Sequence, residues 1–542
     1  MVYNYNLPTT SHLSFQNYLY SSTHPSLPQA ASTARHALRI ALKTHKRLSA
    51  RERESHLQNI LNALNEYIPY LFAINDGLSG RGIKSGGGAG EEEVDITLKE
   101  EFIVEWRPVL SSLASILKSA SVGGGGTKSG GGGGNTRIRG RGIDFEIAFV
   151  IGTLGYVLSG LARVTLLRTL YASSTPTAEQ RAAAVQNATK LLLQASSAHT
   201  LIATSHSTSD EAIAQDSSSS SSNNNNNNNA YAAPQLNTMV QTALASLALA
   251  EATLLAVLKD DAYTFTCIQA RNPLDKEWMV RAPQIPKVRA LLFARLCVRS
   301  AEYAEQAVSG LGSAGAGGRT GRGTTTNTTK VDEDLLKYVQ TVAKVARAKA
   351  CRFFAVDAEL AGKVGEGIAW LRAGKGALGI KKALLPEGES AGKSGTFSKL
   401  KKGWADRRDE RRLEKSNSGS MAVVQGDELS RGDDAGWEEE SRVIDMLESK
   451  WVKMNNTINT QSIPASEPLL SNLPSGRDIH TAPPPYKPPS LDESELIRMR
   501  APPDEADPAI SSLALDDSDE DISPSDEKDP PGPRSATTDS YY

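Results

Sequence analysis

The stretch from Pro286 to Val308, PKVRALLFARLCVRSAEYAEQAV, decides the predicted fold. Proline suits the first turn of a helix, because the N–H that it lacks would be unpaired there. Two rows with four-residue spacing lie side by side on such a helix, one apolar and one bearing arginine: Val288, Leu292 and Leu296, and Leu291, Arg295 and Arg299. The pattern predicts a helix whose apolar face either packs into a core or binds an amphipathic partner helix.

Charge is distributed unevenly along the 542 residues. The net charge of the whole chain is −2. Residues 491–542 hold 15 acidic and 4 basic residues, a net charge of −11, and residues 1–490 therefore carry a net charge of +9. A mildly basic body suits acidic partners or an anionic membrane surface, but it is too dilute for nucleic-acid binding. The basic run 393–415 is either a solvated, partly helical segment or a contact with acidic lipid.

The sequence shows no pattern of a metal or cofactor site. The three cysteines, Cys267, Cys297 and Cys351, are far apart and form no CxxC pair, and the histidines form no HExxH or HxxxH pair. We therefore expect buried cysteines in a reducing compartment, and no metal ligands or cofactors.

The chain carries no segment that we expect to cross or enter a membrane. The opening MVYNYNLPTTSHL lacks the basic and apolar regions of a secretory signal. The uncharged stretch Ala148–Ala162 is shorter than the ~20 residues that a transmembrane helix needs, so we predict a buried core helix. A cytoplasmic protein is the expected result.

Apolar periodicity predicts long helices in succession. One predicted helix begins at Ser32, another begins at Ile143, and a third runs from Thr175-Pro176 to about Ser205. Further predicted helices cover 52–72, 94–117, 236–259, 332–371 and 438–454. Gly362 divides the stretch 332–371 into two antiparallel helices. Pro69 is expected to kink or end its helix, and Pro108 to mark a kink or boundary. Since no stretch alternates convincingly like a strand, the predicted fold is all-α, an α-solenoid.

The domain prediction separates one helical body from a tail. Residues 1–490 form the body, interrupted by low-complexity inserts near 78–93, 121–142, 216–232, 309–330 and 384–435. Residues 491–542 form an acidic tail that we expect to be disordered.

One insert contains two short motifs that resemble catalytic ones, a phosphate-binding loop and a nucleophile elbow. GESAGKSG (388–395) has three residues between Gly388 and Gly392 where a phosphate-binding loop needs four, and it follows no strand. The GxSxG spelling around Ser390 lacks the strand and helix of a nucleophile elbow. A nucleotide-dependent enzyme that uses Gly388–Ser394 is therefore disfavoured, and we predict a protein without catalytic residues.

The run APPPYKPP (482–489) contains a PPxY motif. WW domains bind such motifs because the polyproline II conformation is preformed. Pro483, Pro484 and Tyr486 are candidate WW-ligand residues, and a WW-domain ubiquitin ligase would be the partner. The alternative is a proline-rich linker.

Several stretches resemble one known family. ACRFFAVDAELAGKVGEGIAWLRAG (350–374) resembles the long helical hairpin of the Bro domain, which Alix-like endosomal adaptors share. Further stretches are similar to a fungal subgroup of that family that acts in the response to ambient pH: 7–28, 41–48, 63–75, 144–164 and 453–480. The resemblance covers most of residues 1–490 and leaves the inserts and the tail uncovered.

The resemblance implies a boomerang-shaped α-solenoid with a tetratricopeptide-like core and a binding activity. The implied partner is the C-terminal amphipathic helix of the filament-forming ESCRT-III subunit. The implied role is an adaptor, recruited to endosomal or cortical plasma-membrane sites through its partners, that links ESCRT-III to alkaline-pH signalling and to proteolytic activation of a zinc-finger transcription factor. The alternative within the family is cargo sorting through deubiquitinase recruitment.

The same resemblance implies the residues of the partner-helix site. Aligning AEYAEQA (301–307) with the equivalent helix places two apolar contacts on Leu292 and Leu296. A third contact, aromatic in the family, falls near Leu255, where this chain has no phenylalanine. Ordinary core leucines are the alternative for all three.

Overall fold

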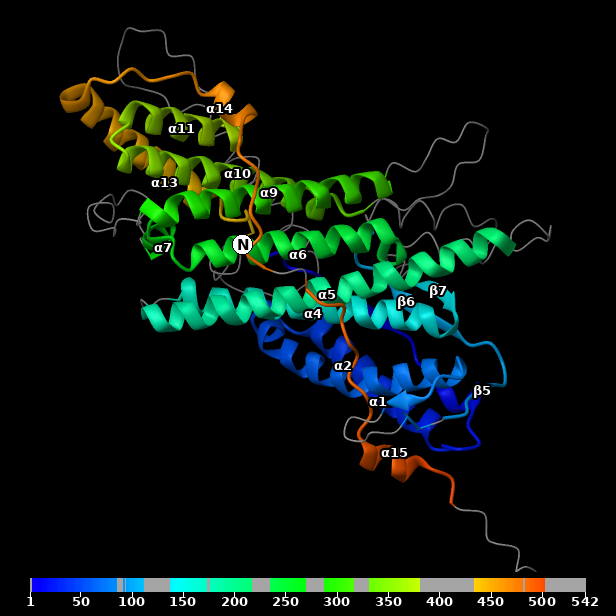
Figure 1. Cartoon of the computed structure of the whole chain (residues 1–542). Coiled ribbons are helices and arrows are strands. Elements are labelled where there is room, and N and C mark those ends of the chain that lie inside the picture. The colour runs from blue at the N-terminus through cyan, green and yellow to red at the C-terminus, as the bar shows by residue number, and fades with distance from the viewer. Residues whose placement is uncertain are drawn as a thin grey trace, which may run out of the picture.

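The computed structural model describes residues 2–84, 91–92, 94–111, 137–172, 176–216, 234–269, 287–315, 331–380, 433–480 and 483–502. Long helices dominate these residues, and Figure 1 shows them lying side by side in layers. Their bounds are α1 Leu27–Arg47, α2 Ala50–Leu78, α4 Gly142–Leu170, α5 Ala178–Asp216, α6 Thr238–Leu258, α7 Ala262–Gln269, α9 Lys287–Gly315, α10 Glu333–Leu360, α11 Val364–Ala377 and α13 Trp437–Met454.

The helices stack in chain order. Each long helix packs against the next one, from α1 and α2 through α4, α5, α6, α9, α10 and α11 to α13. Such a succession of neighbouring contacts is the architecture of an α-solenoid, so the predicted helical stack is confirmed. The division of residues 332–371 is also confirmed, because α10 and α11 meet at Gly362, whose φ of 78° suits a residue without a side chain.

A small sheet corrects the expectation that the chain lacks strands. The segment 94–117, predicted to be helical, contains strand β6 Ile103–Arg107, which pairs with β1 Thr9–Thr10 and β7 Ile138–Arg141 in the order β1-β6-β7. Along β6, Val104 and Trp106 are buried while Ile103 is 51% exposed. This alternation with period two decides for a strand. Two shorter antiparallel pairs are β2 Leu19–Tyr20 with β5 Thr97–Leu98, and β3 Ile83–Lys84 with β4 Glu91–Glu92.

A buried ion pair attaches the sheet to the first helices. Arg35 of α1 donates to the Glu146 carboxylate of α4 at 2.8 Å, and both side chains are buried. Trp106 of β6 donates its indole N–H to the same carboxylate at 2.6 Å, and the Tyr67 hydroxyl of α2 donates at 3.0 Å. The buried Glu146 carboxylate is therefore paired with one cation and accepts hydrogen bonds from three elements, as a buried carboxylate requires.

Two helix boundaries differ from the prediction. Pro69 was expected to kink or end its helix; it lies inside α2, which continues to Leu78, so Pro69 does not end the helix. Helix α5 begins at Ala178, after reciprocal bonds between Thr177 and Gln180 that form a capping box, and it runs past Ser205 to Asp216.

Helix α4 confirms the predicted buried helix at 148–162. It is buried on every side, and its uncharged middle packs between α2 and α5. Helices α4 and α6 are the two helices of the described residues that are long and apolar enough to cross a membrane, but 89% and 72% of their most apolar windows are buried inside the protein. Both are therefore better explained as core helices.

After α13 the chain forms an arm, defined here as residues 455–502. It contains a π-helical turn (Asn455–Asn459), α14 Glu467–Ser471 and α15 Glu493–Met499. In Figure 1 the arm runs as the orange segment from α14 across the stack to α15, beside α1 and α2. Two short helices, α14 and α15, thus follow α13. The expectation of disorder beyond residue 490 is wrong for residues 491–502, because Leu496 and Met499 are buried.

The predicted inserts are described only in part. Their described residues include β3, β4, β7 and the end of α9. The motifs around Gly388, Gly392 and Ser390, and the basic run 393–415, lie outside the described residues.

Candidate partner-binding site on α9

Helix α9 carries the predicted apolar row, and its first described residue is Lys287. Leu296 is fully buried in a core cluster with α10, α11 and α13, and Leu292 packs against the same cluster while staying partly exposed. Leu291, one position away, is 46% exposed. Of the two contact residues that the sequence placed on this helix, Leu292 is therefore the one that an incoming helix could touch.

The arginine row beside these leucines binds the arm. Arg295 donates to the Ser475 carbonyl at 3.2 Å, and its own carbonyl accepts the Arg477 N–H at 3.1 Å. Arg299 donates to the Asp478 carboxylate at 2.7 Å. The arginine edge that marked α9 in the sequence thus holds a segment of the same chain.

A close backbone approach at Gly476 makes this contact testable. A Cβ atom on Gly476 would lie 2.6 Å from the Cα atom of Arg299, which is too close for any side chain. We expect Gly476→Ala to detach this part of the arm and to speed hydrogen exchange of the Arg477 N–H by about tenfold or more, measured by mass spectrometry. The matched control is Gly312→Ala on α9, where a Cβ meets nothing within 4 Å. Unchanged exchange in Gly476→Ala would contradict this geometry.

The third predicted residue, Leu255 of α6, lies in a different environment. It is 1% exposed and packs in a cluster with α4 and α5, away from Leu292 and Leu296. Its neighbour Leu254 is partly exposed and packs against the α9 cluster. The structure therefore brings Leu254, not Leu255, to the cluster of Leu292. The sequence alone could not distinguish the two positions, because both are leucine.

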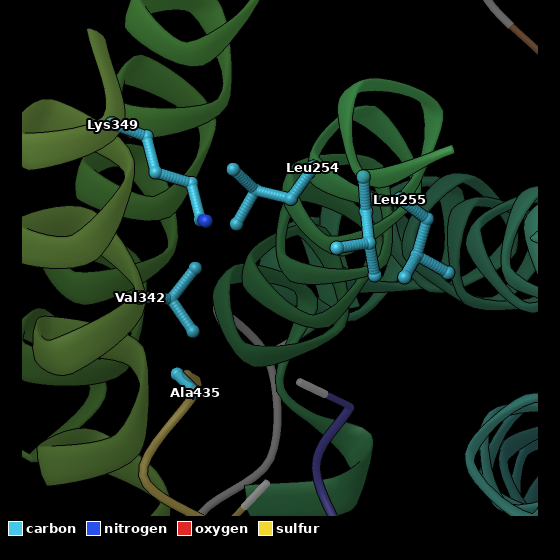
Figure 2. Close-up of a pocket in the computed structure, with 6 residues that line it drawn as sticks. Leu254, Leu255, Val342, Lys349 and Ala435 are labelled. Carbon is cyan, nitrogen blue, oxygen red and sulfur yellow. The ribbon is translucent and has the colours of Figure 1, made fainter. Parts of the chain in front are cut away.

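A narrow pocket opens beside these residues, between α6 and α10. It is lined by Leu254, Leu255, Leu258, Val342, Lys349 and Ala435. Figure 2 shows the Lys349 side chain and Leu254 pointing toward each other across it. Its free volume is only about 10 Å³, room for about one water molecule, so the pocket is too small to receive a side chain of a partner.

Lys349 also belongs to a buried charge cluster, which the sequence analysis missed. The cluster joins Lys349 and Arg352 of α10 to Asp261 before α7 and to Glu440 of α13, and all four side chains are at most 6% exposed. Lys349 lies 2.8 Å and Arg352 2.6 Å from the Glu440 carboxylate.

The charges in this cluster balance. Burial opposes ionisation of Asp261, but Arg352 and Lys349 outweigh it and lower the pKa of this carboxyl to about 2. With two cations facing two anions and no exposed member, the cluster positions α7 and α13 on α10. It offers no group to a substrate.

A second buried carboxylate, Glu251 of α6, holds the N-terminal segment. Its Oε1 accepts the Tyr3 N–H at 3.0 Å and the Tyr338 hydroxyl at 2.9 Å. Its Oε2 is buried and has no hydrogen-bond partner among the described residues. Burial raises the pKa of Glu251 to about 7. No spacing motif in the sequence marks this residue.

The PPxY residues lie on the arm. Pro484 is exposed and Pro483 partly buried, while the Tyr486 ring packs against the core formed by α1, α2 and α4. Burial raises the pKa of Tyr486 to about 12. A WW domain would need that ring, so the predicted role of Pro483, Pro484 and Tyr486 remains a prediction that also requires the arm to detach here.

The cysteines are buried and free, as expected. Burial raises the pKa of all three thiols to about 12, which keeps them protonated near neutral pH. Within the described part of the chain, no three histidine, cysteine or acidic side chains gather as a metal site would need.

Comparison with known proteins decides the family. A scan against protein-family models finds no match. The chain is 52% identical, over 513 residues and 93% of both proteins, to the pH-response regulator protein palC of Emericella nidulans. The chain belongs to the palC family. The recognition of a fungal pH-response regulator in the sequence is thereby confirmed, and the helical body described above is the architecture of a palC-family protein.

Solved structures also resemble this palC-family chain in fold. One is a complex of the ALIX BRO1 domain with CHMP4C, with 13% identity, a TM-score of 0.44, and 90% of this chain and 96% of that chain covered. Another is a Bro1 domain studied for endosomal targeting, with 13% identity, a TM-score of 0.43, and 92% and 95% covered.

Proposed function

We propose that this palC-family chain is a non-catalytic, Bro-type adaptor in ambient-pH signalling. The observation that carries the proposal is the 52% identity, over 93% of both proteins, to a pH-response regulator. The same relative favours pH signalling over the alternative role in cargo sorting. In this role the chain works in the cytoplasm and reaches endosomal or cortical membranes through its partners, upstream of proteolytic activation of a transcription factor.

The proposed partner is the C-terminal amphipathic helix of the ESCRT-III filament subunit. Its docking surface would be the partly exposed apolar pair Leu292 on α9 and Leu254 on α6, which pack against one core cluster. Leu296, which is 1% exposed and belongs to this cluster, would support the surface from below, whereas Leu255 packs in the separate cluster with α4 and α5. A helix that places apolar side chains at i and i+3 or i+4 matches such a strip.

Replacing Leu292 with aspartate tests this surface. We expect the change to weaken binding of a peptide with the ESCRT-III C-terminal helix at least about tenfold, because a central apolar contact is lost and a charge is desolvated. Leu291→Asp is the matched control, since Leu291 is the neighbouring residue and is already 46% exposed, so a charge there stays in water. Fluorescence anisotropy gives the affinities, and circular dichroism checks that both variants keep their helices. Equal binding by a folded Leu292→Asp variant and the wild type would rule out this site.

A further inference from the structure

Six cationic side chains lie where the second half of α1 meets the three-stranded sheet. This basic cluster consists of Arg39, Lys43, Lys46 and Arg47 on α1, Arg107 at the end of β6, and Arg137 just before β7. Arg35, one turn before Arg39 on α1, donates to the Thr10 hydroxyl of β1 at 2.6 Å. Thr9 of β1 pairs with Arg107 of β6, and Trp106 pairs with Ile138 of β7, so Arg107 and Arg137 lie at the same end of neighbouring strands. The charges of the side chains in the basic cluster act on one another. Desolvation and then Arg39, Arg137 and Arg47 lower the pKa of Lys43, while desolvation and then Arg107 and Arg137 lower the pKa of Lys46.

Acidic neighbours do not neutralise the basic cluster. Glu105 of β6 lies 3.9 Å from Arg137, but its shorter contact, 2.7 Å, is with Arg139. Glu52 of α2 is engaged with Ser49 in a capping box. Glu54 forms no ion pair within the described part of the chain. The same is true of five members of the basic cluster: Arg39, Lys43, Lys46, Arg47 and Arg107.

The end of α1 explains only part of this accumulation of charge. Cations in the last turn of a helix are favoured by the helix dipole, which accounts for Lys46 and Arg47. Arg39 and Lys43 lie one or two turns earlier, and the other two members come from the sheet. The Nε atom of Arg39 is moreover buried without a hydrogen-bond partner among the described residues. The fold therefore holds a group of cations that lacks its counter-charge.

The same chain contains a segment of opposite charge. Residues 503–542 hold twelve acidic and two basic residues, a net charge of −10, with the densest group at Asp516–Asp521. This segment leaves the described structure beside α1, because the Ala501 N–H donates to the Thr23 carbonyl at 2.7 Å and Ser26 donates to the Met499 carbonyl at 3.4 Å. Figure 1 shows α15 next to α1 and α2.

The distance between the two charge groups is within reach. From Leu27 to Lys46 the helix rises roughly 29 Å, at 1.5 Å per residue. The fifteen residues from Ala501 to Asp516 can span up to roughly 50 Å when extended. Because the two charge groups belong to one chain, their effective concentration is of millimolar order.

We propose that the acidic segment 503–542 docks on the basic cluster of α1 and the sheet in the same molecule. Charge complementarity and the exit point beside α1 favour this occupant over an anionic membrane, which would have to displace a tethered competitor. The segment then screens the basic cluster, and whatever releases it exposes a cationic surface.

A zero-length crosslinking experiment on the full chain tests this docking. A water-soluble carbodiimide joins a carboxylate to a lysine amine as an amide with loss of water, so only groups in contact react. We expect tail peptides from 504–529 to crosslink to Lys43 and Lys46 about tenfold more than to Lys190 and Lys344, exposed control lysines on α5 and α10. The preference should disappear in about 1 M salt, where the Debye length is roughly 3 Å.

A charge variant and an isotope mixture complete the test. The double variant Arg39→Ala, Arg47→Ala should lower the yield of crosslinks at Lys43 and Lys46. The control double variant Arg168→Ala, Arg289→Ala removes the same charge elsewhere and should leave that yield unchanged. Mixing labelled and unlabelled chains separates links within one molecule from links between two. Equal crosslinking at all four lysines overturns the proposal. So does binding of phosphatidylserine vesicles through Lys43 and Lys46 in a chain whose tail does not crosslink there.

Discussion

Replacing Arg352 with leucine should lower the free energy of unfolding by about 3–5 kcal/mol. The guanidinium of Arg352 is fully buried and contacts the carboxylates of both Asp261 and Glu440. Without it, Lys349 alone faces two buried anions, and one of them is left without a partner. Urea denaturation followed by circular dichroism measures the loss, provided that the transition is two-state.

The matched control for Arg352 is an arginine in an exposed ion pair. Arg139 lies 2.7 Å from Glu105, but its side chain is 75% exposed. We expect Arg139→Leu to change the free energy of unfolding by less than about 1 kcal/mol. Similar losses in the two variants would mean that the buried cluster does not hold α7 and α13 in place.

The second large effect is a pH dependence set by Glu251. Its folded-state pKa of about 7 lies above the ordinary 4.5, because burial disfavours the carboxylate. The protonated form therefore stabilises the fold. That contribution is complete below pH 4.5 and is lost as the pH rises through 7. The shift corresponds to roughly 3 kcal/mol.

Comparison with Glu251→Gln isolates this contribution, because glutamine does not titrate. Between pH 4.5 and 8, the stability of the wild type should fall by about 3 kcal/mol relative to the variant, measured by urea denaturation at each pH. Other titrating groups, such as Glu439 and His199, are present in both proteins and cancel. Parallel pH profiles for the two proteins would show that Glu251 keeps an ordinary pKa.

Periodicity predicted the helical stack well because long helices repeat their signal over many turns. The buried character of α4 followed from fifteen residues without a charge, and Gly362 marked the turn between α10 and α11. Strand β6 was missed because its alternation, IVEWR, covers only five residues within a run that also suits a helix. Its partners come from residues 9–10 and 138–141, which local patterns do not connect.

The candidate site was predictable only in part for a similar reason. The four-residue spacing of Leu292 and Leu296 places both on one face, but the depth of each depends on α10, α11 and α13. The arginine row indicated a polar contact, yet its partners lie about 180 positions later. Asp261 and Arg352 are 91 positions apart, so no spacing motif could pair them.

The arm has a consequence for how the protein comes apart. A stack in which each layer touches only its neighbours behaves as a one-dimensional chain and can fray from either end. Here the arm is hydrogen-bonded near the turn between α10 and α11 through Gln461 and contacts α9 through Asp478. Its far end is hydrogen-bonded to Thr23, just before α1. The two ends of the stack are thereby coupled, so the melting of one end removes a restraint on the other. Local fraying becomes a cooperative event that involves the whole molecule.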